Sequence, residues 1–150
     1  MNRLASKGCA ALVFLLVLPV MAKAQDAEPG LPPQDLPAGE CGAFFWDRAE
    51  PNPLRLFENE SRGLARLWRA GEILELGTTA RSGPYAAGQR VSRAYRLPSG
   101  EVISIEGEIT AAREGEAVIG RALLRRTLPG GAEEVSPLMG LISCREAADR

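Results

Sequence analysis

The sequence predicts an all-β fold, a small antiparallel barrel or sandwich of about eight strands closed by one disulfide. Three observations support this prediction. Runs of alternating apolar and polar residues recur between positions 41 and 144, a turn containing glycine or proline separates each run from the next, and one cysteine stands at either end of the region. The sequence leaves open whether the strands close into a barrel or stack as a sandwich.

The first 24 residues have the pattern of an export signal peptide. Arg3 and Lys7 precede an apolar stretch over residues 9–21, and Ala-Lys-Ala at residues 22–24 is typical of a cleavage site. A membrane anchor is the alternative, but the apolar stretch is shorter than the roughly 20 residues that a spanning helix needs. We therefore expect a periplasmic or secreted protein that begins at Gln25 and has no membrane span.

Residues 25–40 are predicted to form a disordered tether. Prolines are frequent in this segment, and Leu31 and Leu36 are its only bulky apolar residues. Proline favours extended backbone and cannot donate to a β-ladder, so we expect the segment to space the domain without packing on it. The β-domain then covers residues 41–144, and the polar residues 145–150 are expected to fray.

In the first half of the domain, short apolar runs separated by turns predict four strands. The third and fourth runs flank Ala70-Gly71, which predicts a hairpin with a short turn. A single helix over residues 61–76 is the competing interpretation, because Leu64, Leu67 and Trp68 have helical spacing; Gly71 favours the strands. The four runs are residues 44–46, 54–57, 63–69 and 72–78.

In the second half of the domain, the alternation of apolar and polar residues is clearer and predicts four more strands. Their runs are residues 90–97, 101–110, 117–128 and 138–144. Two sets of side chains share one face within a run: Val91, Arg93, Tyr95 and Leu97, then Ile103, Ile105, Gly107 and Ile109. In the third run, the side chains that can face inward are Val118, Gly120, Ala122, Leu124 and Leu128.

The cysteines indicate a structural bridge. Cys9 lies in the predicted signal, which leaves Cys41 and Cys144 in an exported chain, where disulfides form and persist. Closing a loop of roughly 100 residues could stabilise the fold by up to about 4 to 5 kcal/mol in the chain-entropy model. The alternatives are two free thiols or a metal pair, and two thiolates without histidine do not complete a zinc site. We predict no metal site and no cofactor.

Composition excludes several classes of chemistry. The chain has no histidine, and its only lysines, Lys7 and Lys23, lie in the predicted signal. Histidine-based catalysis, lysine Schiff bases and imidazole ligation of metals are therefore absent from the mature chain. After removal of the signal, 15 arginines stand against 19 acidic residues, a formal net charge of −4. We expect no nucleic-acid partner.

Paired carboxylates are the feature that could indicate an enzyme. Glu72 with Glu75, and Glu106 with Glu108, are close in sequence, and the second pair shares one face of a predicted strand as a glycosidase pair could. Alternate glutamates opposite an isoleucine-rich face are also typical of a solvated surface, which is the interpretation we prefer. A carboxylate-based glycan hydrolase is thus the less favoured alternative, and we predict no catalytic residues.

Arginines and aromatic residues offer two further candidate surfaces. Three arginine groups could bind an anion, although pairing with glutamates is the favoured interpretation; they are residues 62, 66 and 69, residues 90, 93 and 96, and residues 121, 125 and 126. Four aromatic residues could form a sugar-stacking platform, although a role in the core is favoured; they are Trp46, Trp68, Tyr85 and Tyr95.

The segment from Thr78 to Gln89 is the candidate binding loop. It joins two predicted strands and is longer than a tight hairpin turn, and loops of that kind on a rigid scaffold often carry function. Ser82, Gly83 and Tyr85 are its candidate contact residues. A surface loop without a partner is the alternative.

Several features together resemble the small exported C-type lysozyme inhibitors of bacteria. They are Glu40-Cys41-Gly42, Ile142-Ser143-Cys144, the hairpin over residues 67–76, and the following Ser82-Gly83-Pro84-Tyr85. The resemblance implies an antiparallel β-barrel whose loop enters the lysozyme cleft. The loop is one residue shorter than the family's Ser-Gly-x-x-Tyr pattern, and the mature chain lacks the lysine that often marks the family's second loop.

The chain equally resembles an uncharacterised bacterial periplasmic domain with a Cys-Gly-x-Phe-x-Trp opening and a Gly-Leu-Ile-x-Cys ending, for which no activity is implied. We therefore expect a secreted or periplasmic binding domain without catalysis, whose partner is a secreted or envelope protein such as a lysozyme. A structural or envelope-associated domain with no discrete ligand is the alternative.

Overall fold

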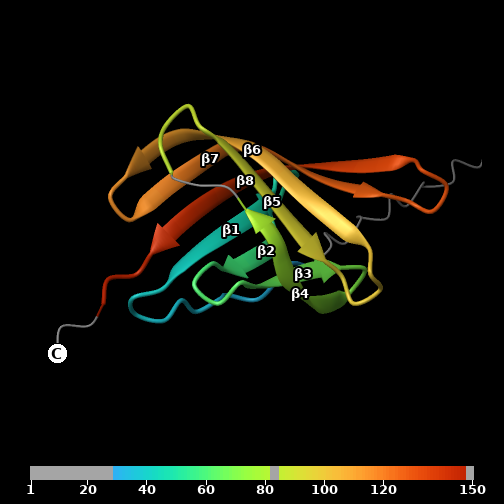
Figure 1. Cartoon of the computed structure of the whole chain (residues 1–150), viewed down its shortest axis with the longest axis horizontal. Helices are drawn as coiled ribbons and strands as arrows, with labels where there is room; N and C mark the ends of the chain where they lie inside the picture. The colour runs from blue at the N-terminus through green and yellow to red at the C-terminus, as the bar shows by residue number, and fades with distance from the viewer. Residues whose placement is uncertain (1–28, 82–84, 148–150) are drawn as a thin grey trace, which may run out of the picture.

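The chain folds as a closed antiparallel barrel of eight strands, shown by a computed structural model that describes residues 29–81 and 85–147 (Figure 1). Each strand pairs with the next along the chain, and the last strand pairs with the first. The all-β prediction is confirmed, and the barrel is formed in place of the sandwich. The strands are β1 (Cys41–Asp47), β2 (Leu54–Asn59), β3 (Leu64–Arg69), β4 (Glu72–Arg81), β5 (Arg90–Arg96), β6 (Val102–Arg113), β7 (Glu116–Thr127) and β8 (Glu133–Cys144).

The hairpin of β3 and β4 excludes the helix over residues 61–76. Leu67 faces Leu74 across the ladder, and the two turn residues Ala70 and Gly71 have φ values of 51° and 86°. Two positive φ values in a row give a turn whose twist matches that of the flanking strands. This turn joins two strands and does not fit inside a helix, so it outweighs the helical spacing of the leucines.

A bulge in β7 reverses part of the predicted inward face. The pairing of β7 with β8 shifts between Ile119 and Ala122, so the residues before the shift point the opposite way from those expected. Val118 is 43% exposed, whereas Ala117 and Ile119 are buried. The prediction was wrong for Val118. Beyond the shift, Ala122 is buried as expected.

The last strand is longer than the predicted run of residues 138–144. It begins at Glu133 and includes Pro137, which pairs with Leu123 of β7. Pairing with β1 starts only at Leu138, so the first part of β8 has one open edge, where a residue without an N–H is tolerated. In Figure 1 the orange and red hairpin of β7 and β8 extends beyond the rest of the barrel.

The core fills the barrel interior and comes from the alternating inward positions of the strands. The predicted alternation in β5 and β6 is confirmed, and the shared face lies inside, because Val91, Tyr95, Ile103, Ile105 and Ile109 are all almost fully buried. The remaining buried apolar residues of this cluster are Ala43, Phe45, Leu56, Ala65, Leu67, Leu76, Leu97, Ala117, Ile119, Ala122, Leu138 and Ile142. An interior filled in this way is expected for a barrel of this strand number.

The described part of the N-terminal segment packs on the barrel, contrary to the expected loose tether. Leu31 is buried, and its backbone N–H donates to the carbonyl oxygen of Leu54 at 2.7 Å. Gly30 lies so close to Leu54 that a Cβ there would be 2.7 Å from the same oxygen. Proline-rich backbone can therefore lie along a strand edge and bury an apolar side chain, since extended chain needs no ladder of its own. Residues 25–28 lie outside the described residues.

The C-terminal tail is also held at its start. Arg145 donates its backbone N–H to Glu40 and its side-chain Nη1 to the carbonyl oxygen of Leu36, and the backbone N–H of Gly39 donates to Arg145. The expectation of fraying was therefore wrong for Arg145, because this residue pairs with the segment that precedes β1. Residues 148–150 lie outside the described residues.

The predicted bridge between Cys41 and Cys144 is present, and it closes the seam of the barrel. The two cysteines are direct partners in the ladder of β1 and β8, with their Cα atoms 4.0 Å apart. The covalent bond therefore joins the first strand to the last at the end of the barrel where β1 begins. Among the described residues, no helix is long and apolar enough to cross a membrane.

Candidate functional site

The candidate binding loop joins β4 to β5. Two of its predicted contact residues, Ser82 and Gly83, lie outside the described residues. Tyr85 is described, and its ring packs against the hydrophobic core. The described part of the site therefore consists of Tyr85 and the side chains that hold it.

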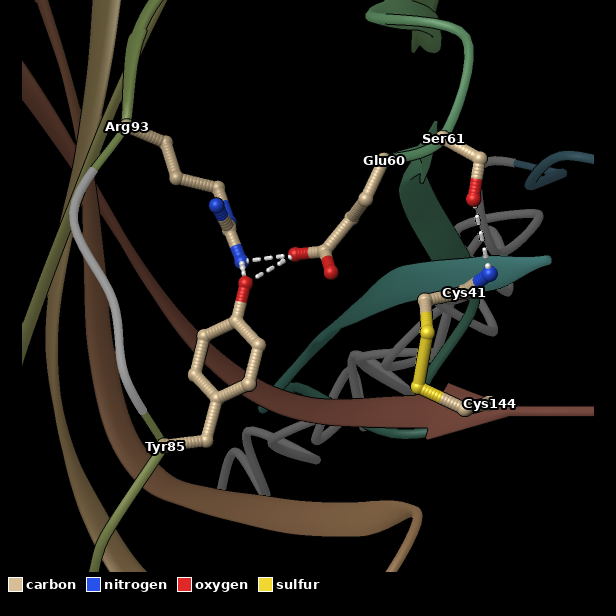
Figure 2. The surroundings of a disulfide bond; sticks show 6 residues. All are labelled: Cys41, Glu60, Ser61, Tyr85, Arg93 and Cys144. Carbon is tan, nitrogen blue, oxygen red and sulfur yellow. Dashed lines mark hydrogen bonds and ion pairs between the residues drawn. A yellow bond between two sulfur atoms is a disulfide. The ribbon is translucent and has the colours of Figure 1, made fainter.

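The Tyr85 hydroxyl is held between a carboxylate and a guanidinium (Figure 2). It donates to Oε1 of Glu60 at 2.5 Å and accepts from Nη2 of Arg93 at 2.9 Å. The same Arg93 nitrogen also donates to Glu60 Oε1 in a short ion pair. Three side chains from the end of β2, from β5 and from the loop thus form a closed triangle of charge-assisted hydrogen bonds, which are stronger than neutral ones.

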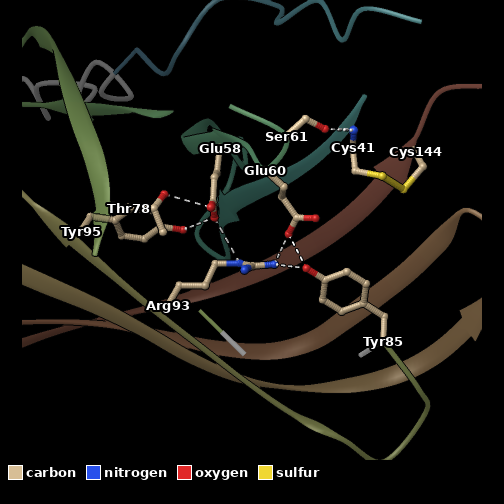
Figure 3. A network of polar contacts seen from close by, with 9 residues as sticks. All are labelled: Cys41, Glu58, Glu60, Ser61, Thr78, Tyr85, Arg93, Tyr95 and Cys144. Atoms are coloured by element: carbon tan, nitrogen blue, oxygen red, sulfur yellow. Dashed lines mark hydrogen bonds and ion pairs between the residues drawn. A yellow bond between two sulfur atoms is a disulfide. The ribbon is translucent and has the colours of Figure 1, made fainter. Parts of the chain in front are cut away.

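Glu58 extends this triangle into the barrel interior (Figure 3). Its Oε2 accepts from the Tyr95 hydroxyl at 2.9 Å and lies 3.3 Å from Nε of Arg93. Its Oε1 accepts from the Thr78 hydroxyl at 2.9 Å. The side chains of Glu58 and Arg93 are fully buried, so polar contacts replace apolar packing in part of the interior. We call Glu58, Glu60, Thr78, Tyr85, Arg93 and Tyr95 the polar cluster.

Burial and charge shift the titration of the polar cluster. Burial raises the pKa of Tyr85, and the hydrogen bond to Glu60 raises it further. Burial and the negative charge of Glu58 raise the pKa of Tyr95 well above its usual value. Burial lowers the pKa of Arg93, but the neighbouring carboxylates and Tyr85 outweigh that effect, so its pKa is raised. Both tyrosines therefore stay protonated and Arg93 stays charged over a wide pH range.

Backbone hydrogen bonds hold the part of the loop that follows Tyr85. The N–H of Gly88 donates to the carbonyl oxygen of Ile109 at 2.8 Å, and the N–H of Ile109 donates back to Gln89 at 2.9 Å. The N–H of Gln89 also donates to Ala86. Residues 85–89 are thus fixed to β6 from one side and to the polar cluster through Tyr85.

The polar cluster lies directly beside the disulfide. The N–H of Glu60 donates to the carbonyl oxygen of Cys41 at 2.9 Å, and the N–H of Cys41 donates to the hydroxyl of Ser61 at 3.1 Å (Figure 2). The seam of the barrel, the end of β2 and the loop anchor therefore form one connected unit.

Sequence reasoning missed most of this cluster. The alternation put Arg93 on the same strand face as Val91 and Tyr95, but no inward or buried role was inferred for it. Glu58 and Glu60 were not singled out from the sequence, although they continue the inward alternation that Leu56 begins. An arginine and two glutamates at inward positions of two strands is the signal that could have predicted a buried ion pair.

The other candidate carboxylates lie on the surface. Glu106 and Glu75 are mostly exposed, with side-chain exposures of 63% and 80%, and each lies within ion-pair distance of an arginine. Glu72 and Glu108 are also exposed. This placement agrees with the solvated face that the sequence analysis preferred.

The arginine groups pair with glutamates, as favoured from the sequence. Arg93 is buried, whereas its group members Arg90 and Arg96 are exposed, so this group does not form one patch. The pairs are Arg62 with Glu40, Arg66 with Glu75, Arg69 with Glu101, Arg93 with Glu58 and Glu60, Arg125 with Glu106 and Glu133, and Arg126 with Glu101 and Glu134.

The four aromatic residues do not form a single platform. Tyr95 is in the core and Tyr85 belongs to the polar cluster. Trp46 stacks on Phe44 with ring centroids 5.9 Å apart. Trp68 lines a cavity at the end of the barrel opposite the disulfide.

Within residues 29–81 and 85–147, no group of three or more cysteine, aspartate or glutamate side chains is arranged to hold a metal ion. Comparison with known proteins gives no match: no family model, no curated protein and no solved structure is significantly similar to this chain.

Proposed function

We propose that the protein is a non-catalytic binding domain, exported to the periplasm or secreted, which presents the loop between β4 and β5 to a lysozyme-like envelope hydrolase. The observation that carries the proposal is the anchoring of Tyr85 by Glu60 and Arg93. Anchoring a loop at one residue by charge-assisted bonds lowers the conformational entropy that it loses when a partner binds, and this supports affinity.

The anchor limits where the contact residues of the loop can be. Ser82 precedes Tyr85 by three residues, so covalent geometry keeps their Cα atoms within about 11 Å of each other. In this proposal the Ser82 hydroxyl meets the catalytic carboxylates of the partner. Tyr85 then acts from within the domain by positioning the loop, which revises the expectation that its ring contacts the partner at the rim.

The charge of the chain supports the choice of partner. Without residues 1–24 the formal net charge is −4, and C-type lysozymes are typically basic. Opposite charges accelerate encounter, and salt screens them. Binding should therefore weaken as the salt concentration rises.

An inhibition assay with a matched serine control tests this proposal. At low salt, micromolar protein should inhibit a C-type lysozyme, and Ser82→Ala should weaken inhibition by about 1 to 4 kcal/mol, the usual cost of truncating a central contact. Ser99→Ala, in the exposed turn between β5 and β6, should leave inhibition unchanged. Absence of inhibition by the wild-type protein at low salt would refute the proposal.

A further inference from the structure

A second feature lies at the end of the barrel opposite the disulfide. There a cavity of about 400 Å³ opens where β3 ends and β6 begins. Leu67 and Ile103, both buried core residues, form part of its wall together with Leu124. Small-ligand sites are frequently found in the mouths of β-barrels, with mostly apolar walls and a few polar groups. The lining of this cavity is divided between apolar and polar side chains, with more charged groups than such sites usually have.

The polar wall of the cavity consists mainly of hydrogen-bond donors. Arg55, Arg69 and Arg126 line it, whereas Glu134 is its only acidic lining residue. Asp47 and Glu101, which pair with these arginines, do not line the cavity, whereas Glu134, which pairs with Arg126, does.

Arg69 and Arg126 keep donors beyond these ion pairs. A guanidinium carries five N–H donors, and Arg69 donates to Glu101 through Nη1 at 3.1 Å. The remaining donors of such a group can bind a second anion. Carboxylates are the ligands that the planar guanidinium fits best, alongside phosphates.

Trp68 adds an aromatic side chain to the same wall. Its Nε1 is shielded from solvent and has no hydrogen-bond partner among the described residues, and Trp68 lines the cavity. Ala70, at the mouth, has a positive φ of 51° in a turn where asparagine is usual. The small side chain of Ala70 leaves the cavity entrance without the side-chain amide that an asparagine would place there.

We propose that this cavity binds a small amphipathic carboxylate, with the carboxylate at Arg69 and Arg126 and a short apolar chain against Leu67 and Ile103. The two ends of the ligand match the two kinds of wall. The site is independent of the β4–β5 loop and does not rest on the proposed protein partner.

Fluorescence of Trp68 can report the binding directly. The chain has two tryptophans, so a Trp46→Phe variant leaves Trp68 as the only one and retains an aromatic ring beside Phe44. Titration with octanoate should change the emission of Trp68 saturably, with a Kd on the order of 0.1 mM for a ligand of this size. Isothermal titration calorimetry on the wild-type protein should give the same Kd.

Three comparisons decide the chemistry of the site. Octanol, which has the tail without the charge, and acetate, which has the charge without the tail, should each bind at least about tenfold more weakly than octanoate. Arg69→Gln and Arg126→Gln should each weaken octanoate binding about tenfold or more. Arg121→Gln, an exposed arginine on β7 that does not line the cavity, should leave the Kd unchanged.

Two results would overturn the proposal. The first is the absence of saturable binding at millimolar octanoate by both fluorescence and calorimetry. The second is octanol or acetate binding as tightly as octanoate, because the site would then lack either the anion contact or the apolar contact. Since lysozyme inhibition is measured separately, failure of this site and failure of the loop proposal are distinguishable.

Discussion

At the disulfide end of the barrel, charged side chains lie inside, whereas at the opposite end they lie around the rim of a cavity. Arg93 is fully buried between Glu58 and Glu60. Arg126, at the other end, is paired with Glu134, whose side chain is 48% exposed. Buried pairs are costly to break because a lone charge remains without water, while exposed pairs contribute little. Buried ion pairs thus stabilise the disulfide end of the barrel, whereas the exposed ion pairs at the opposite end can break at little cost.

The largest expected effect comes from the covalent bond at the fixed end. Replacing both cysteines, Cys41→Ala with Cys144→Ala, should lower the free energy of unfolding by up to about 4 to 5 kcal/mol, because the bridge closes a loop with a sequence separation of 103 residues. Urea denaturation with and without reductant measures this. An unchanged midpoint after verified reduction would show that the β1–β8 ladder alone holds the seam.

The next effect tests the buried charge itself. Arg93→Met should cost about 3 to 5 kcal/mol of stability, because Glu58 and Glu60 then remain buried without their cation. Arg96→Met, three residues further along at an exposed position, is the matched control and should change stability by less than about 0.5 kcal/mol. Equal losses for the two variants, measured by urea denaturation, would remove the distinction between inward and outward arginines.

High pH should loosen the fixed end selectively. Tyr85 and Tyr95 are the only tyrosines of the chain, and burial, together with Glu60 or Glu58, raises the pKa of each above the usual value of about 10. Above pH 10 the unfolded chain loses protons that the folded chain keeps. The stability that these tyrosines contribute is therefore complete below pH 10 and declines above it, by up to about 1.4 kcal/mol per pH unit for each tyrosine.

Phenolate absorbance and circular dichroism, followed together, measure this alkaline transition. The two signals should change in parallel, since each tyrosine ionises when the polar cluster opens. Tyr85→Phe should reduce the steepness of the transition. Phenolate formation near pH 10 with the circular dichroism of the fold intact would contradict the closed arrangement of the cluster.

The smallest effect is expected at the open end. Arg126→Gln should change the free energy of unfolding by less than about 1 kcal/mol, because its ion pairs are partly exposed and screened by water. The same urea measurement applies, with Arg93→Met as the reference for a buried arginine. A loss as large as that of Arg93→Met would show that the rim stabilises the fold, and the contrast between the two ends would disappear.

The strands and the bridge could be predicted from the sequence, because alternation, turn residues and the two cysteines are local signals. Closure of the barrel depends on pairing between the first and last strands, which no local pattern specifies. The bulge that turns Val118 outward could not be predicted from local sequence either, since it arises from the register of β7 against β8. Proline content suggested a loose N-terminal segment, but Leu31 finds a buried position that depends on the barrel surface.

The candidate site was predicted only in part for the same reason. Tyr85 was identified from its loop, and Arg93 only as a member of an arginine group. Their association with Glu58 and Glu60 requires β2 and β5 to face each other across the interior, which follows from the closed barrel and not from spacing along the chain.

The position of the disulfide has a consequence for cleavage of the chain. All eight strands lie between Cys41 and Cys144, so the bonded region is a covalent ring. A protease that cuts once within this ring, for example in the exposed turn at Ser99, opens it into a linear chain without releasing a fragment. The nicked molecule keeps both new ends tethered to the barrel, and two cuts are needed before any strand can diffuse away.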